Sequence, residues 1–276
     1  MLYGFTVTPG RMEEHLDYAA AYNFRLVELS LPAIIPFELM LHDAKIRLLR
    51  RFADENLLAY AFNIPFTLNL GDLFPEVRER ALEYLMNCIN FASKISVKHI
   101  NLHFGKFKWF PFEDIMRRRT LDRFAENIKP ALDLAGKFNI KITLENLYPV
   151  RLHNEYYYLG DNCFDFEYLF SKIESPVLKV CLNTGHANLA EGAELYAEKL
   201  ADKLECIHLC DNRGDDDDHL LPGEGSVNWS NFIDVLNRNN FRGSFVAECP
   251  DAEPHEVIKK FEWLQVESKL KYNTVV

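Results

Sequence analysis

The regular alternation of strand-like and helical segments along the whole chain is the feature that most constrains the fold. Eight short runs rich in aliphatic and β-branched residues predict strands at residues 2–7, 25–31, 57–64, 97–104, 140–146, 178–183, 206–211 and 244–250. Apolar residues recur at three- and four-residue spacing in the segments between and after them, as one buried helical stripe requires. These helical segments are residues 13–22, 43–55, 76–95, 119–138, 166–173, 193–204, 230–239 and 255–271.

Eight strand–helix units in a chain of 276 residues are typical of a parallel (β/α)8 barrel. The competing fold is a doubly wound open sheet, which usually carries a glycine-rich phosphate loop after its first strand. No such loop follows residues 2–7, and no low-complexity linker or composition break marks a domain boundary. We therefore predict an α/β fold, a single TIM-barrel domain over residues 1–276.

The charge balance argues against nucleic acid as the main partner. The chain has 41 acidic and 31 basic side chains, which gives a formal net charge of −10. A protein that binds nucleic-acid phosphates normally shows a basic surface. The one basic cluster, residues 117–119, is expected to form a solvated helix face.

Several features predict a cytoplasmic protein without a membrane segment. The sequence has no apolar stretch of about 20 residues, the length that a membrane-spanning helix needs. The first residues, MLYGFTVTPGRMEEH, lack the basic segment and apolar run of a secretory signal. The six cysteines are scattered without a CxxC pair, so we expect reduced thiols. The sequence makes no prediction about the oligomeric state.

Polar side chains are predicted to point into the barrel near the ends of five consecutive strands. Successive residues of a strand face opposite sides, and the outward positions of a barrel strand pack on helices and are aliphatic. In CIHLCD, for example, Ile207 and Leu209 face outward, so His208 faces inward. The same rule predicts that these further side chains face inward: His103, Glu145, Asn183 and Glu248. Barrel enzymes carry their catalytic residues at this end of the strands.

Burying two carboxylates and two imidazoles at one place costs free energy unless a further interaction compensates for their lost hydration. A divalent metal ion provides it, and these oxygen and nitrogen donors suit Zn²⁺, Mn²⁺ or Co²⁺. The alternative is a buried network of ion pairs and hydrogen bonds without a metal. The sequence favours a divalent metal cofactor, with Zn²⁺ or Mn²⁺ preferred.

Five motifs of the chain resemble those of the xylose-isomerase-like barrel superfamily. They are LHFG at 102–105, LEN at 144–146, LNTGHANL at 182–189, IHLCDNRGDDDDHLLPGEG at 207–225 and VAEC at 246–249. That superfamily includes sugar and sugar-phosphate isomerases and epimerases, inosose dehydratases and the endonuclease IV branch. The resemblance covers nearly the whole chain and implies the same barrel.

In the isomerase and epimerase branches, the resemblance implies one metal held by Glu145, Asn183, His208 and Glu248. Asn183 departs from the family, which usually has Asp there, and the change removes one negative charge from the site. His186 and Arg213 match positions that contact substrate oxygens. The metal would polarise a ketose carbonyl while Glu145 and Glu248 exchange the proton on the substrate carbon.

The endonuclease branch implies three metals. Asn63 stands where that branch has a histidine ligand, and it is a candidate substrate contact here, while His103 and Glu145 match the rest of the first site. His186, Asp217 and His219 match the third. The neighbouring acids Asp215, Asp216 and Asp218 are expected to form a solvated edge of the loop.

The sequence therefore favours a metal-dependent isomerase or epimerase in carbohydrate metabolism. Its partner would be a small sugar or sugar phosphate, converted by proton transfer through an enediolate. One alternative is an endonuclease IV-like zinc phosphodiesterase. The other is a non-catalytic sugar-binding barrel whose two asparagines, Asn63 and Asn183, have abolished the chemistry. The aromatic segments 106–112 and 151–162 would cover the substrate or pack among themselves.

Overall fold

Eight parallel strands close into a barrel, as the alternating pattern predicted. The computed structural model describes residues 2–8, 12–31, 43–108, 113–149 and 156–273. The barrel strands are β1 Leu2–Val7, β2 Leu26–Ser30, β3 Ala59–Asn63, β4 Val97–His103, β6 Lys141–Glu145, β8 Leu178–Asn183, β9 Leu204–Leu209 and β10 Ser244–Ala247. Each pairs with its neighbours in parallel, and β1 closes the ring against β10. All eight predicted strands are confirmed.

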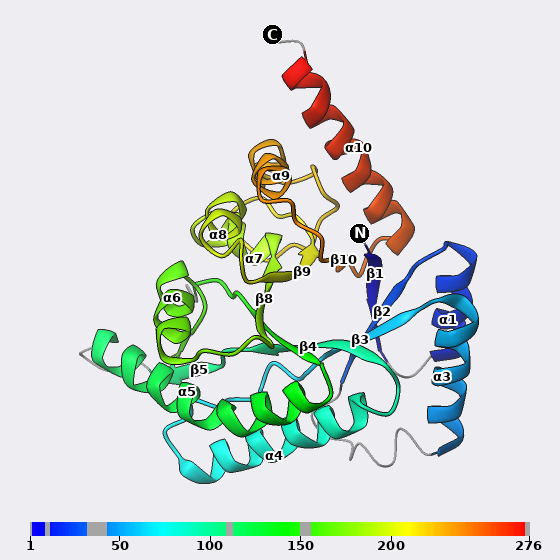
Figure 1. Cartoon of the computed structure of the whole chain (residues 1–276). Helices are drawn as coiled ribbons and strands as arrows, with labels where there is room; N and C mark the ends of the chain where they lie inside the picture. The colour runs from blue at the N-terminus through cyan, green and yellow to red at the C-terminus, as the bar shows by residue number, and fades with distance from the viewer. Residues whose placement is uncertain (1, 9–11, 32–42, 109–112, 150–155, 274–276) are drawn as a thin grey trace.

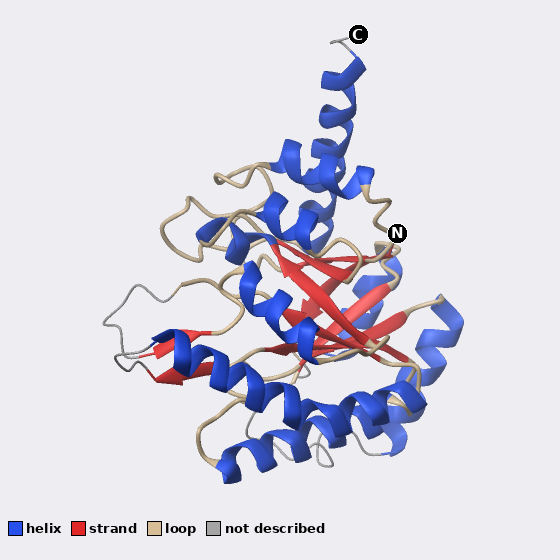
Figure 2. Ribbon diagram, turned by 60° about the vertical axis from the view of Figure 1, so that its left-hand side comes forward, coloured by secondary structure: helices blue, strands red, loops and turns tan. Residues whose placement is uncertain are grey.

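Helices surround the barrel (Figures 1 and 2). They are α1 Met12–Ala21, α3 Asp43–Asn56, α4 Pro75–Ala92, α5 Glu113–Lys137, α6 Cys163–Lys172, α7 Thr184–Leu189, α8 Ala193–Lys199, α9 Trp229–Arg238 and α10 Pro254–Asn273. In α4, Ala81, Leu85, Cys88 and Ala92 are buried at three- and four-residue spacing, so one stripe faces the barrel. None of the helices in the described part of the chain has the length and hydropathy needed to span a membrane.

The barrel separates two packing regions. Outward aliphatic side chains such as Ile100, Leu102 and Leu144 join the helices in the main hydrophobic core. A much smaller apolar cluster fills the lower interior of the barrel: Leu26, Ala61, Cys181, Cys206 and Val246. Above that cluster, toward the C-terminal ends of the strands, the interior becomes polar.

Two features were not predicted from the sequence. Residues Lys106–Lys108 form β5, which pairs in antiparallel register with β7, Tyr156–Tyr158. This two-stranded ribbon joins the loops that follow β4 and β6, and Phe107 stacks on Tyr157 within it. The remainder of the two aromatic segments, residues 109–112 and 151–155, lies outside the described residues. The short helix α7 is the second feature, and it begins directly after Asn183.

The expectation of a solvated basic cluster at residues 117–119 is wrong for Arg117. Arg118 and Arg119 are exposed, but the Arg117 side chain is only 10% exposed and its Nη1 lies 2.7 Å from both Asp161 Oδ1 and Asp165 Oδ2. Asp165 lies in the first turn of α6, and Asp161 lies just before this helix. Burial raises the pKa of Asp165 to about 6 although Arg117 opposes the shift. The ion pair therefore only partly offsets the cost of burying this carboxylate.

Replacing Arg117 with Met should destabilise the barrel by about 3 kcal/mol, because Asp165 keeps its place in the interior without a cation. Arg118→Met is the matched control and should change the free energy of unfolding by less than about 0.5 kcal/mol. Urea unfolding followed by circular dichroism measures both. Equal stabilities of the two variants would contradict a structural role for the Arg117 ion pair.

Candidate metal centre

Acidic and imidazole side chains from three strands and from Glu248, directly after β10, meet at the C-terminal end of the barrel. His208 Nδ1 lies 3.2 Å from Glu248 Oε2 and 3.5 Å from Glu145 Oε1. His103 Nε2 lies 3.3 Å from Glu145 Oε2. The structure therefore brings together His103, Glu145, His208 and Glu248, which the strand alternation predicted to point inward. We call Glu145, His208 and Glu248 the central triad.

The carboxylate of Glu145 is ionised in this environment. Burial alone would raise its pKa, but the charges and hydrogen bonds of His208 and His103 hold the pKa well below its usual value. Glu248 is more accessible, with 19% of its side chain exposed against 1% for Glu145. The central triad thus has one carboxylate at its floor and one at its open side.

The central triad fits a divalent cation through three ligands. Its ligand atoms all lie within 4.8 Å of one another. His208 Nδ1 makes no hydrogen bond of good geometry within the described part of the chain, so this nitrogen is available to a metal ion that displaces its proton. Two carboxylates and one imidazole are a donor set that suits Zn²⁺ and Mn²⁺.

Asn183 turns its amide nitrogen toward this triad. Its Nδ2 donates to Glu145 Oε1 at 3.0 Å and to Glu248 Oε2 at 2.8 Å. Its Oδ1 accepts from the backbone N–H of His186 at 3.0 Å, as the N-cap of α7, and from the thiol of Cys210 at 3.2 Å. Reversing the amide would set its NH₂ group against the backbone N–H, which can only donate.

The orientation of Asn183 disagrees with the expected role of this residue as a metal ligand. The amide nitrogen carries no free lone pair and contacts the same carboxylate oxygens that would hold the ion. An aspartate at this position would cap α7 with one oxygen and offer the other to the metal. Asparagine can do only the first.

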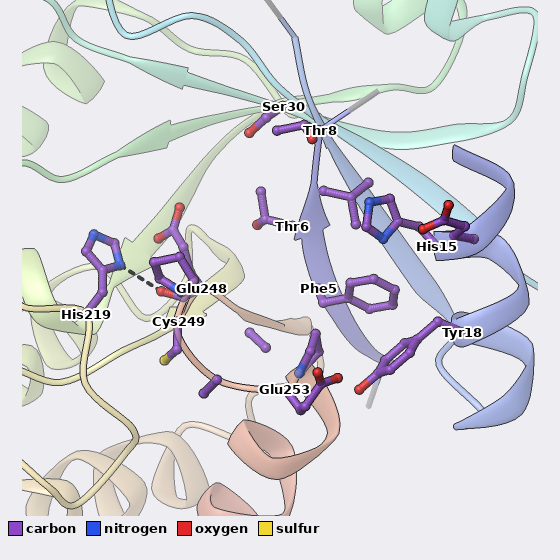
Figure 3. A pocket seen from close by; sticks show the side chains of 16 residues that line it. Phe5, Thr6, Thr8, His15, Tyr18, Ser30, His219, Glu248, Cys249 and Glu253 are labelled. Atoms are coloured by element: carbon purple, nitrogen blue, oxygen red, sulfur yellow. Dashed lines mark hydrogen bonds between the residues drawn. The ribbon is translucent and has the colours of Figure 1, made fainter. Parts of the chain in front are cut away.

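A second group, which we call the outer triad, consists of His186, Asp217 and His219. Asp217 Oδ2 lies 3.3 Å from His186 Nε2 and 3.2 Å from His219 Nε2. One ligand atom from each of these three side chains lies within 4.8 Å of the other two. His219 Nδ1 donates to the backbone carbonyl of Glu248 at 2.7 Å (Figure 3). The hydrogen bond with Asp217 raises the pKa of His219 to about 12.

Within the acidic run at residues 215–218, only the aspartate of the outer triad is partly buried. Asp217 is partly buried between two imidazoles, whereas Asp215, Asp216 and Asp218 are exposed. The sequence predicted this division.

Two further expected substrate contacts, Arg213 and Asn63, differ in exposure. The side chain of Arg213 is 64% exposed, and its guanidinium lies 3.3 Å from Asp218 Oδ2 on the same loop. The placement of Arg213 therefore does not support its expected contact with substrate oxygens beside the metal. Asn63 is half-buried at the end of β3, in register with Asn101 of β4.

Two buried residues that the sequence interpretation missed support the central triad. Asn101 Nδ2 donates to Glu145 Oε2. Glu28 Oε1 lies 3.1 Å from His208 Nε2 and also accepts from Thr6 Oγ1 at 3.1 Å. Burial would raise the pKa of Glu28, but His208 and His99 lower it to about 2. This carboxylate therefore orients the imidazole of His208 and leaves Nδ1 free to face the triad.

The signal for both missed residues was present in the strands. Glu28 alternates with Val27 and Leu29 in β2, and Asn101 alternates with Ile100 and Leu102 in β4. The same inward rule that predicted His208 applies to them.

Aromatic rings stand beside the histidines. Phe66 packs edge-on against His103 with 5.2 Å between ring centroids, and Tyr158 packs against Phe66 at 5.0 Å. Tyr148 lies 5.1 Å from His186. Tyr158 thus contacts a ring beside the centre, whereas Tyr157 stacks on Phe107 in the ribbon.

A cavity of about 770 Å³ opens beside Glu248 and His219. The hydroxyls of Thr6, Thr8 and Ser30 line it (Figure 3). The volume suits a small ligand, and the mixture of hydroxyls, carboxylate and imidazole suits a polyhydroxylated one.

Comparison with known proteins agrees with this geometry. A family model described as the xylose isomerase-like TIM barrel matches residues 16–266. An uncharacterized protein of Methanocaldococcus jannaschii, MJ1614, is 26% identical over 190 residues, which are 66% of this chain and 68% of that protein. The D-psicose 3-epimerase of Enterocloster bolteae is 24% identical over 245 residues, 86% of this chain and 76% of the relative. Further relatives are named fructoselysine 3-epimerase and probable endonuclease 4.

Among solved structures, a D-tagatose 3-epimerase-like protein is similar along its full length. It superposes with a TM-score of 0.83 at 22% identity, and the match covers 100% of both chains. At this level of identity the likeness concerns the fold.

Asn183→Asp should bind Mn²⁺ at least about tenfold more tightly than the native chain, because it adds a fourth, charged ligand and removes the competing N–H group. Titration against a chelating indicator measures the affinity. Asn231→Asp makes the same charge change at an exposed position of α9 and should leave the affinity unchanged. Weaker or equal binding by Asn183→Asp would show that the amide is not what limits the site.

Proposed function

Because the chain belongs to the family of xylose isomerase-like TIM barrels, we propose that it is a metal-dependent isomerase or epimerase of a small sugar or sugar phosphate. The observation that carries the proposal is the convergence of Glu145 and Glu248. Both carboxylates lie within hydrogen-bonding distance of Asn183 Nδ2, at 3.0 Å and 2.8 Å. Two carboxylates so close together suit the removal and return of one proton on one carbon.

Glu145, His208 and Glu248 would hold the metal. A divalent ion bound there supplies positive charge that polarises a substrate carbonyl and an adjacent hydroxyl. The outer triad would lie beside the substrate, where His186 can donate to a substrate oxygen.

The chain's own groups account for the proton transfer. One carboxylate takes the proton from the carbon next to the carbonyl, and the C–H electron pair moves toward the carbonyl oxygen. The other carboxylate, or the same one from its own side, then returns a proton to that carbon or to its neighbour. Return to the opposite face inverts the carbon. Return to the former carbonyl carbon isomerises the sugar, provided that the hydroxyl on the deprotonated carbon passes its proton to the former carbonyl oxygen. Glu248 lines the cavity, so it has the more direct access to a ligand.

The surroundings favour a carbohydrate as substrate. The cavity presents hydroxyls on one side of the centre. Phe66 and Tyr148 add apolar ring surface beside His103 and His186, and Tyr158 packs on Phe66. Hydroxyls and rings together match the polar edge and apolar faces of a sugar ring or chain.

One observation favours a second candidate function, a zinc phosphodiesterase. The outer triad has the composition of a metal site, and a proton-transfer enzyme with one metal does not need it. Two neighbouring metal ions can activate water and stabilise a phosphoryl group. The formal net charge of −10 weighs against DNA as the substrate.

Glu248→Gln should reduce proton exchange by about 10²–10⁴-fold, because the amide cannot accept the proton. The measurement is deuterium incorporation from D₂O into ketoses and ketose phosphates, followed by proton NMR with Mn²⁺, Co²⁺ or Zn²⁺ present. Glu256→Gln, at an exposed glutamate in the first turn of α10, is the control and should exchange at the native rate.

Three outcomes would contradict the proposal. Native exchange by Glu248→Gln would remove this carboxylate from the chemistry. Hydrolysis of a phosphodiester with Zn²⁺, lost in Asp217→Asn and without any exchange, would support the phosphodiesterase. Sugar binding without either reaction would leave a binding protein.

A further inference from the structure

A second set of metal-ligating side chains lies deeper in the barrel than the central triad. Its members come from four strands and are fully buried, with 0% exposure: Glu28, His99, Cys181 and Cys206. We call them the lower cluster. They occupy inward positions of β2, β4, β8 and β9, below the level of Glu145 and Glu248.

Three donor atoms of the lower cluster are close enough to share one ion, and the fourth, Cys181 Sγ, lies beside one of them. The carboxylate of Glu28, a ring nitrogen of His99 and the Sγ of Cys206 all lie within 4.8 Å of one another. The Sγ atoms of Cys181 and Cys206 and a ring nitrogen of His208 also lie within 4.8 Å of one another. Cys206 belongs to both groups, and it pairs in register with Cys181 on the neighbouring strand.

His99 has no hydrogen-bond partner within the described part of the chain. Both of its ring nitrogens are buried and unsatisfied. The nearest acid oxygen, Glu28 Oε2, lies 3.6 Å from Nε2, which is too far for a hydrogen bond. A fully buried imidazole without a partner is costly. A metal ion between His99 and Glu28 would satisfy the lone pair of the ring.

Glu28 connects the lower cluster to the central triad. Its Oε1 accepts from Thr6 and lies 3.1 Å from His208 Nε2. Its Oε2 is farther from His208, at 3.4 Å, and faces His99. One oxygen therefore orients His208 for the central triad, while the other remains for a ligand in the lower cluster.

The surroundings of the lower cluster are those of a closed site. Cys181 and Cys206 pack with Leu26, Ala61 and Val246 in the small apolar cluster inside the barrel. None of the four side chains lines the cavity beside Glu248. Structural zinc sites have this character: four protein ligands, thiolates among them, and no open position.

We propose that the lower cluster binds a second divalent ion, with Zn²⁺ the best match, through Cys206, Cys181, His99 and Glu28. Two thiolates, an imidazole and a carboxylate are soft and borderline donors that select zinc over Mn²⁺ or Mg²⁺. The ion neutralises the buried carboxylate and joins β2, β4, β8 and β9 across the barrel. It is a structural ion, distinct from the one that the central triad would hold.

Cobalt substitution tests the lower cluster directly, because thiolate ligands give Co²⁺ an intense near-ultraviolet charge-transfer band. The protein is produced in cobalt-supplemented medium so that the ion can enter during folding. We expect the band in the native chain and its loss in the double variant Cys181→Ser with Cys206→Ser. The variant should also lose about one equivalent of metal per chain.

Two controls separate this proposal from the proposed function. Cys88→Ser with Cys163→Ser removes two buried thiols outside the barrel interior and should keep the band. Glu145→Gln with Glu248→Gln should keep the band while it loses any metal of the central triad. Loss of exchange activity without loss of the band would leave the lower cluster intact.

X-ray absorption on zinc-loaded native protein covers the case in which the cysteine variants do not fold. We expect sulfur scatterers in the zinc shell at about 2.3 Å. A folded native protein without the cobalt band and without zinc–sulfur scattering would overturn the proposal. Unchanged metal content in the folded double cysteine variant would also overturn it.

Discussion

The burial of the Glu145 carboxylate is the constraint on which the site depends. A charge that is 1% exposed inside a barrel needs several partners, and the neighbouring strands and α7 provide them. The partners are Asn101, His103, Asn183, His186 and His208. Each of these groups is in turn fixed by a further contact, such as Glu28 on His208 and the α7 N-cap on Asn183. The chemistry proposed for the site depends on these contacts, because they hold the Glu145 carboxylate ionised and in place.

Asn183 is where the chain departs most clearly from an acidic metal site. The helix cap uses the only acceptor of the amide, so the side chain can present nothing but a donor to Glu145 and Glu248. It holds the two carboxylates together by hydrogen bonds in a place where an aspartate would add a third negative charge. A metal ion at the central triad would therefore have three ligands, and its affinity would depend on how readily the ion displaces those two hydrogen bonds.

The strand alternation was sufficient to predict the barrel and the inward direction of the residues that end its strands. The same alternation points Glu28 and Asn101 inward, but the prediction covered only the residues at the strand ends. Other features depend on contacts between distant segments and carry no local signal. Arg117 is buried because α5 meets Asp161 and Asp165, and β5 exists because it pairs with β7. The orientation of the Asn183 amide likewise depends on α7, a helix too short for periodicity to reveal.

The central claim is that Glu145, His208 and Glu248 form one metal site from which the Asn183 oxygen is excluded. Anomalous diffraction from crystals soaked in Mn²⁺ tests it most directly. The account predicts a peak at roughly 2.0–2.2 Å from a carboxylate oxygen of each glutamate and from His208 Nδ1, with Asn183 still capping α7. A peak confined to the outer triad, or one bound by Asn183 Oδ1 with the cap broken, would contradict it.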